Sequence, residues 1–172
     1  MSTMLFLTLR VLHVLLAAVW LGATVFMTFL LMPAMKEAGP AGGQVMMGLN
    51  RRGVVPFFAS VSGITVLTGI YLFWRFTGGF DPEVSRTNAG LAYSIGGAAG
   101  LAAAIIGGSI VGRSAKKLVE VMTRVASLKD GAEKSALIQE ADGLRQRMAS
   151  FGKLVLVLQV AATALMAVAH YI

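Results

Sequence analysis

Cysteine is absent from this chain of 172 residues, and charged residues make up only 13% of it. Without cysteine there can be no disulfide, thiolate metal site, iron–sulfur cluster or haem attached through thioether bonds. The charged fraction is about half the average for soluble domains, whereas 56% of the residues are hydrophobic. Long stretches without charge favour an integral membrane protein, because an ionisable group at the bilayer centre costs several kcal/mol.

The net charge of +7 does not indicate a nucleic-acid partner. The basic residues flank apolar segments, as the positive-inside rule expects of a protein in a lipid bilayer. The first apolar segment, Met4 to Met32, is too long for the hydrophobic region of a secretory signal peptide. We therefore interpret it as a membrane span.

Four apolar segments are long enough to cross about 30 Å of hydrocarbon. They are residues 4–32, 54–76, 89–111 and 154–172. Backbone groups in lipid must find hydrogen-bond partners within their own segment, so each segment predicts a transmembrane helix. The sequence predicts an all-α fold, with one integral membrane domain over residues 1–172 forming a four-helix antiparallel bundle. We expect the first helix to end before Pro33, and residues 33–50 to form a loop rich in Gly, Pro and Met.

Residues 113–150 combine charge with two apolar stripes at helical spacing. The stripes are Leu118, Val121, Met122, Val125 and Leu128 on one arm, and Leu137, Ile138, Ala141, Leu144 and Met148 on the other. Residues 129–131 (Lys-Asp-Gly) read as the turn between the arms. The pattern predicts that the third and fourth helices extend beyond the membrane as a cytoplasmic helical hairpin.

The basic residues predict the orientation. Twelve of the 15 Lys and Arg residues lie in or beside the first and third connections, and three lie on the opposite side: Arg10, Arg75 and Arg86. The positive-inside rule therefore places residues 113–150 in the cytoplasm and both termini on the other side. We expect a multi-pass protein of a bacterial inner membrane, with periplasmic N- and C-termini and direct contact with lipid.

The third predicted helix has a small residue at every fourth position: Gly96, Gly100, Ala104, Gly108 and Gly112. Such a glycine face lets two helix backbones approach closely. It predicts a packing surface, either within the bundle or between protomers. The sequence is compatible with a homo-oligomer and with membership of a larger membrane complex.

The only two histidines, His13 and His170, both lie in apolar segments. An ionisable residue within a membrane span is costly, so its presence suggests a functional role. Pro33 and Lys153 mark the cytoplasmic boundary on the first and the last helix. At 1.5 Å per residue, His13 lies about 30 Å from the first mark and His170 about 26 Å from the second. The first and last helices of such a bundle are commonly neighbours. Two imidazoles at similar height near the outer surface could therefore supply the two axial ligands of a haem iron.

Other side chains share a helix face with each histidine. Ala17 and Trp20 follow His13 at helical spacing, and Ala17 would leave room for a flat macrocycle. Arg10 lies one turn outward and could pair with a haem propionate. Met166 shares a face with His170, together with Gln159 and Thr163. Tyr93, Tyr171 and Arg86 are further candidates near this surface.

The first two apolar segments resemble known small bacterial membrane families. The likeness rests on Leu12-His13, Trp20, Gly22, Phe26 and Pro33, and on Asn50-Arg51-Arg52, Ser62-Gly63 and Thr68-Gly69. The residues of the first segment are similar to those of CopD-like proteins, related four-helix families and HemJ-type protoporphyrinogen oxidases. Those of the second segment are similar to the CopD-like group. The resemblance implies a link to haem b or copper, with His13 at the position of the first-span histidine of HemJ-type proteins.

Three functional hypotheses follow. The first is a b-type cytochrome with His13 and His170 as iron ligands, passing electrons to a quinone or a redox partner. Haem-dependent oxidoreductase activity stays open, because no catalytic group can be named. The second is a non-catalytic accessory subunit that holds partners through the glycine face and the hairpin. The third is copper transport, since thioethers suit Cu(I) and methionines gather near the first connection: Met27, Met32, Met35, Met46 and Met47.

Overall fold

The computed structural model describes residues 3–172 and is 91% helical. No β-strand occurs within these residues, and four of their helices are long and apolar enough to span a membrane. The prediction of an all-α fold with four such helices is confirmed. The helical elements are α1 (Thr3–Phe26), η1 (Met27–Leu31), α2 (Met32–Glu37), α3 (Pro40–Arg51), α4 (Val54–Phe76), α5 (Pro82–Ser85), α6 (Asn88–Ile106), η2 (Gly107–Gly112), α7 (Arg113–Ser127), α8 (Ala132–Val168) and η3 (Ala169–Tyr171).

The prediction that the first helix ends before Pro33 is wrong. Helix α1, the π-helix η1 and α2 form one continuous helix from Thr3 to Glu37. In η1 the hydrogen bonds reach one residue further than in an α-helix, as from Met32 N–H to Met27 O. The wider turn accommodates the ring of Pro33, which in a regular α-helix collides with the carbonyl four residues earlier.

The expected loop over residues 33–50 is also helical for most of its length. Helix α3 follows α2 after a turn at Gly39, whose φ of 56° favours glycine. The two helices approach so closely that a Cβ atom at Gly42 would collide with the backbone of Met35. The glycines that suggested a loop therefore allow a tight helix–helix contact instead.

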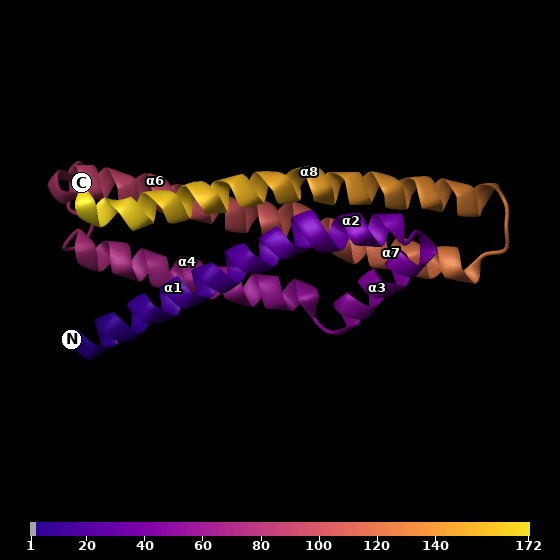
Figure 1. The fold of residues 1–172 in the computed structure, drawn as a ribbon, viewed down its shortest axis with the longest axis horizontal. Coiled ribbons are helices and arrows are strands. Elements are labelled where there is room, and N and C mark those ends of the chain that lie inside the picture. The colour runs from indigo at the N-terminus through magenta and orange to yellow at the C-terminus, as the bar shows by residue number, and fades with distance from the viewer. Residues whose placement is uncertain (1–2) are drawn as a thin grey trace.

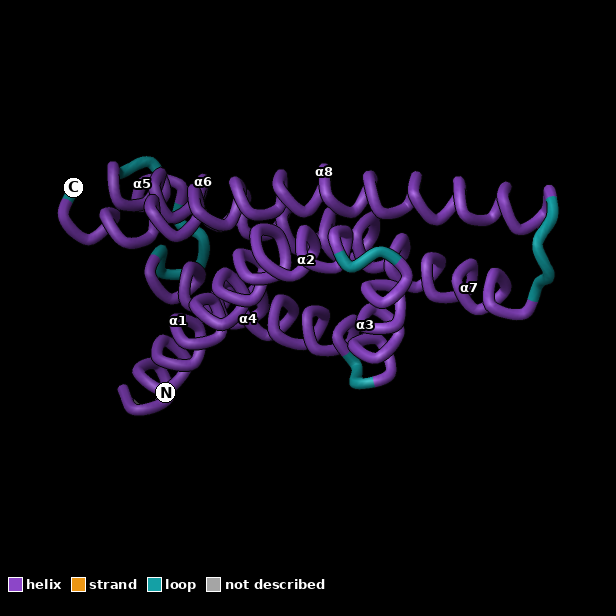
Figure 2. Tube along the Cα trace, turned by 45° about the vertical axis from the view of Figure 1, so that its right-hand side comes forward, coloured by secondary structure: helices purple, strands orange, loops and turns teal. Residues whose placement is uncertain are grey.

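The third apolar helix continues from Asn88 to Ser127 through the π-helix η2, and α8 runs along most of the molecule (Figure 1). Helices α7 and α8 lie side by side and are joined by a short loop, drawn in teal in Figure 2. Their predicted apolar stripes pack together with Met46 of α3. Ile138 is the exception, because its side chain is 42% exposed.

The apolar helices pack as two close pairs, α1 with α4 and α6 with α8, and α4 also contacts α6. The glycine face of α6 serves packing within the chain at Gly96, where a Cβ atom would lie 3.2 Å from Ala162 O of α8. The N-terminal part of α1 diverges from α8, so the two chain ends lie apart at one end of the molecule (Figures 1 and 2). Helices α1 and α8 are nevertheless in contact, as expected for the first and last apolar helices of the bundle.

Candidate functional site

A cavity of about 570 Å³ lies between α1, α4, α6 and α8 at the end that carries both termini. Its volume is in the range of small-molecule and cofactor sites. All six residues predicted for the haem site line it: Arg10, His13, Ala17, Trp20, Met166 and His170. Tyr93, Gln159 and Thr163 also line it, whereas Arg86 and Tyr171 are not part of the lining.

His13 reaches across from α1 and is fixed by α4. Its Nδ1 lies 2.9 Å from the backbone oxygen of Thr65 and 3.1 Å from Thr68 Oγ1. A carbonyl oxygen can only accept, so Nδ1 carries the proton and donates it. The proton of Thr68 Oγ1 goes to Ile64 O at 2.7 Å, which leaves the hydroxyl oxygen free to accept from His13.

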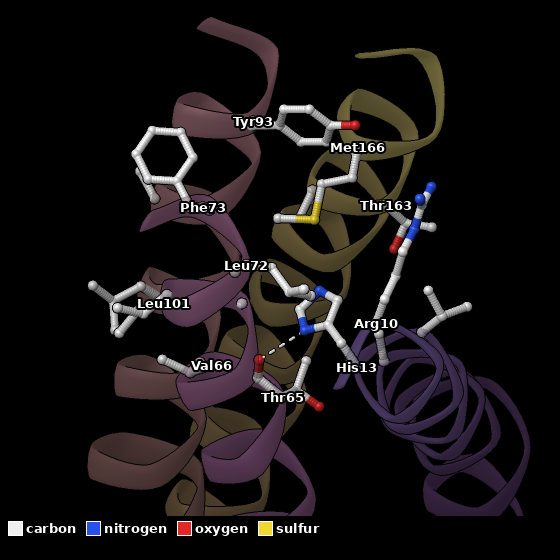
Figure 3. Close-up of a pocket in the computed structure, with 18 of the residues that line it drawn as sticks. Arg10, His13, Thr65, Val66, Leu72, Phe73, Tyr93, Leu101, Thr163 and Met166 are labelled. Carbon is white, nitrogen blue, oxygen red and sulfur yellow. Dashed lines mark hydrogen bonds between the residues drawn. The ribbon is translucent and has the colours of Figure 1, made fainter. Parts of the chain in front are cut away.

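In the neutral form of this ring, the other nitrogen, Nε2, is unprotonated and has a free lone pair. In Figure 3 this nitrogen faces away from Thr65, on the side where Met166 and Tyr93 lie. Among the described residues it has no hydrogen-bond partner. A neutral imidazole whose Nδ1–H bonds to a backbone carbonyl is the usual arrangement of a histidine that binds a metal through Nε2.

Gly69 allows this placement of the ring. A Cβ atom at position 69 would lie 2.9 Å from His13 Cε1, closer than real Cβ contacts come. Glycine at this position of α4 therefore lets the Cε1 edge of the imidazole approach the helix closely. The sequence likeness marks Thr68 and Gly69, but only the contact between α1 and α4 shows that both residues serve His13.

Gln159 of α8 is the most unusual polar residue in the lining. Its side chain is 4% exposed, and neither its amide nitrogen nor its amide oxygen has a hydrogen-bond partner in the described part of the chain. An unpaired polar group in an apolar interior costs about 1–3 kcal/mol or more. Such groups are rare in native structures and call for an explanation, such as a bound ligand or water.

His170 lies in η3, the last helical turn, and its side chain is exposed. Its ring makes an edge contact with Tyr171, with ring centroids 5.6 Å apart. Met166 lies one turn closer to the middle of α8, and its sulfur points into the space above His13 (Figure 3). His170 of η3 and Met166 of α8 thus line the same cavity as His13 of α1.

The chain matches no model of a known protein family, no curated protein and no solved structure. Within residues 3–172 no group of three or more His, Cys, Asp or Glu side chains could hold a metal ion. A metal that brings its own macrocycle needs only one or two protein ligands, and the lining offers these.

The methionines considered for copper lie elsewhere. Met46 is buried between α3, α7 and α8, and Met32 and Met35 pack against that cluster. Another sulfur in the same cluster, Met122 Sδ, accepts a hydrogen bond of 3.5 Å from Arg145. The positive charge of Arg145 at this distance disfavours the binding of a copper ion to the Met122 sulfur.

One lining residue carries backbone strain that the sequence analysis did not anticipate. Phe80 has a φ of 66°, and its ring lies 6.0 Å from that of Phe73. A bulky residue in this region is an outlier, and such strain is common at functional sites. Thr77, 1% exposed, holds the turn because its Oγ1 accepts from Phe80 N–H at 2.8 Å.

Proposed function

We propose that the protein is a small membrane cytochrome that binds one b-type haem in the cavity between α1, α4, α6 and α8. The observation that carries the proposal is the state of His13. Its Nδ1–H is committed to Thr65 O, and its Nε2 faces a cavity of about 570 Å³ that His170 also lines. His13 and His170 are the iron ligands in this proposal, from the first and the last apolar helix.

The rest of the lining suits a flat, mostly apolar group with a charged edge. Ala17, Gly97 and Ala162 leave room, and Trp20 and Phe73 provide apolar surface. Arg10 has no ion-pair partner among the described residues and lies one turn before His13, where it can neutralise a propionate. Bound haem would supply reversible one-electron oxidation and reduction, so the task is electron transfer to a quinone or a redox partner.

The topology belongs to the same proposal. The four apolar helices form an antiparallel bundle in a bacterial inner membrane, and α7 and the first part of α8 form a cytoplasmic hairpin. The support is the excess of Lys and Arg at the hairpin end, where 12 of the 15 lie. The two histidines then lie near the periplasmic surface.

The test is the haem content of the full-length protein, purified in detergent after growth with haem supply. We expect about one haem per chain, a loss of most of it in His13→Ala, and a smaller loss in His170→Ala, because His170 is the more exposed ligand. A cavity-filling variant adds an independent arm. Gly97 lines the cavity and has no atom within 4 Å of a Cβ position, so Gly97→Leu should lower haem retention.

Gly22→Leu is the matched control. A Cβ atom at Gly22 also meets nothing within 4 Å, and Gly22 is outside the cavity lining. It should keep the haem content of the parent protein. A colourless parent protein, or equal haem content in the parent and in His13→Ala, would contradict the proposal.

A further inference from the structure

A second cavity, of about 380 Å³, lies on the other side of Trp20. Trp20 is 6% exposed and lines both cavities, so it separates them. The second cavity extends along the first helix from Trp20 to Met32. These residues are about 18 Å apart along a helix axis, which is close to the thickness of one leaflet of hydrocarbon, about 15 Å.

The walls of the second cavity are mostly apolar and include both π-helices. Met27 and Thr28 come from η1, and Gly107, Gly108 and Gly112 from η2. Single π-helical turns inside long helices occur frequently at functional sites. Here each π-helix contributes residues to the same space, between the middle of the apolar helices and their polar ends.

Three cations complete this lining: Arg113, Lys116 and Lys153. They stand where the third apolar segment ends and the fourth begins, and their side chains are exposed. In the part of the chain that the structure describes, none of the three has a carboxylate partner. Four cations of the hairpin, by contrast, do pair with acids: Lys117, Arg124, Lys134 and Arg145.

From this arrangement we infer that the second cavity binds one anionic phospholipid, with an acyl chain between η1 and η2 and the phosphate at Arg113, Lys116 and Lys153. The length of the cavity, its apolar walls and the cations at the polar boundary match a molecule with one charged end and a tail one leaflet long. Basic pockets between transmembrane helices bind such headgroups. The site is separate from the haem cavity, so either proposal can fail without the other.

The experiment is native mass spectrometry of the full-length protein in detergent, titrated with phosphatidylglycerol. The parent protein should retain one lipid. The triple variant Arg113→Gln, Lys116→Gln and Lys153→Gln should bind it at least tenfold more weakly, since each cation near an anionic headgroup is worth about fivefold in affinity. A triple control, Lys36→Gln, Arg51→Gln and Arg52→Gln, removes the same charge outside the lining and should retain the lipid.

A second pair of variants tests the apolar part of the site. Gly108 lines the cavity and has no atom within 4 Å of a Cβ position, so Gly108→Leu should exclude the acyl chain without a collision at Cβ. The matched control is Gly63→Leu, because Gly63 also has no atom within 4 Å of a Cβ position and lies outside the lining. This variant should bind phosphatidylglycerol as the parent protein does. Equal retention in Gly108→Leu and Gly63→Leu would overturn the inference.

Two further probes identify the ligand chemistry. Inorganic phosphate at the same concentration should not displace phosphatidylglycerol, and phosphatidylcholine should be retained at least tenfold less, because its headgroup has no net charge. Displacement by phosphate would show a free-anion site. Equal retention of phosphatidylcholine would show general contact with lipid. Either result would refute a specific anionic phospholipid site.

Discussion

At the level of single residues, the position of His13 depends on Gly69. A methyl group at position 69 would press on the imidazole at 2.9 Å from Cε1, and the ring would have to leave Thr65 O. We predict that Gly69→Ala lowers haem retention severalfold and shifts the visible absorption bands of what remains. Gly63→Ala is the control, because Gly63 lies between one and two turns earlier on α4 and no atom lies within 4 Å of a Cβ atom there. This variant should keep the haem retention and the absorption bands of the parent protein. Identical spectra for the two variants would show that the ring is not held in this way.

Gln159 provides a separate test of the same cavity. Its two unpaired amide atoms cost free energy in the haem-free protein. We predict that Gln159→Leu stabilises the haem-free form by about 1–3 kcal/mol, because the polar group is replaced by an apolar one of similar size. Thermal unfolding in detergent measures the change. The exposed Gln139→Leu should stay within about 0.5 kcal/mol of the parent. Destabilisation by Gln159→Leu would mean that the amide already has a partner.

The sequence indicates some of these residues but not their partners. His13 and His170 stand out because histidine is rare in an apolar segment, and helical spacing then points to Arg10, Ala17, Trp20 and Met166. All six line one cavity. Thr65 could not be found in this way, since it acts through its backbone oxygen and any residue has one. Its role depends on the contact between α1 and α4, which no local pattern reveals.

Among the helices, α7 and the first half of α8 form a packed unit away from the proposed haem cavity. Leu118 is 2% exposed and lies in the cluster between α3, α7 and α8. We predict that Leu118→Ala costs about 2–5 kcal/mol of stability in this unit. Hydrogen exchange should then accelerate in α7 and the first half of α8, with haem content unchanged. Ile138→Ala removes a 42% exposed side chain and should have little effect. Similar exchange in both variants would contradict the packing described here.

The apolar stripes of this unit were predictable, because amphipathic spacing is a local property that burial simply follows. The course of residues 33–50 was not. Pro33 reads as a helix end, yet η1 widens the turn around it, and Gly42 allows contact with α2 where a loop was expected. Both outcomes depend on hydrogen bonding and packing that extend beyond the residues themselves.

For the molecule as a whole, the proposed orientation can be tested directly, since the chain has no cysteine to remove. We predict that a single cysteine at Asp81→Cys reacts with a membrane-impermeant maleimide in intact spheroplasts. Lys129→Cys should react only after the membrane is permeabilised, because it lies at the hairpin end that carries the excess of Lys and Arg. The reverse pattern of labelling would contradict the orientation and would place the haem cavity on the cytoplasmic side.

The central claim is that His13 and His170 share one iron. Low-temperature electron paramagnetic resonance of the oxidised, purified protein tests it most directly, together with the same measurement on His170→Ala and Met166→Leu. We predict a low-spin six-coordinate signal in the parent protein and in Met166→Leu, and a high-spin five-coordinate signal in His170→Ala. A low-spin signal that persists in His170→Ala but is lost in Met166→Leu would assign the second ligand to the methionine, and the absence of any haem signal in the parent protein would contradict the account altogether.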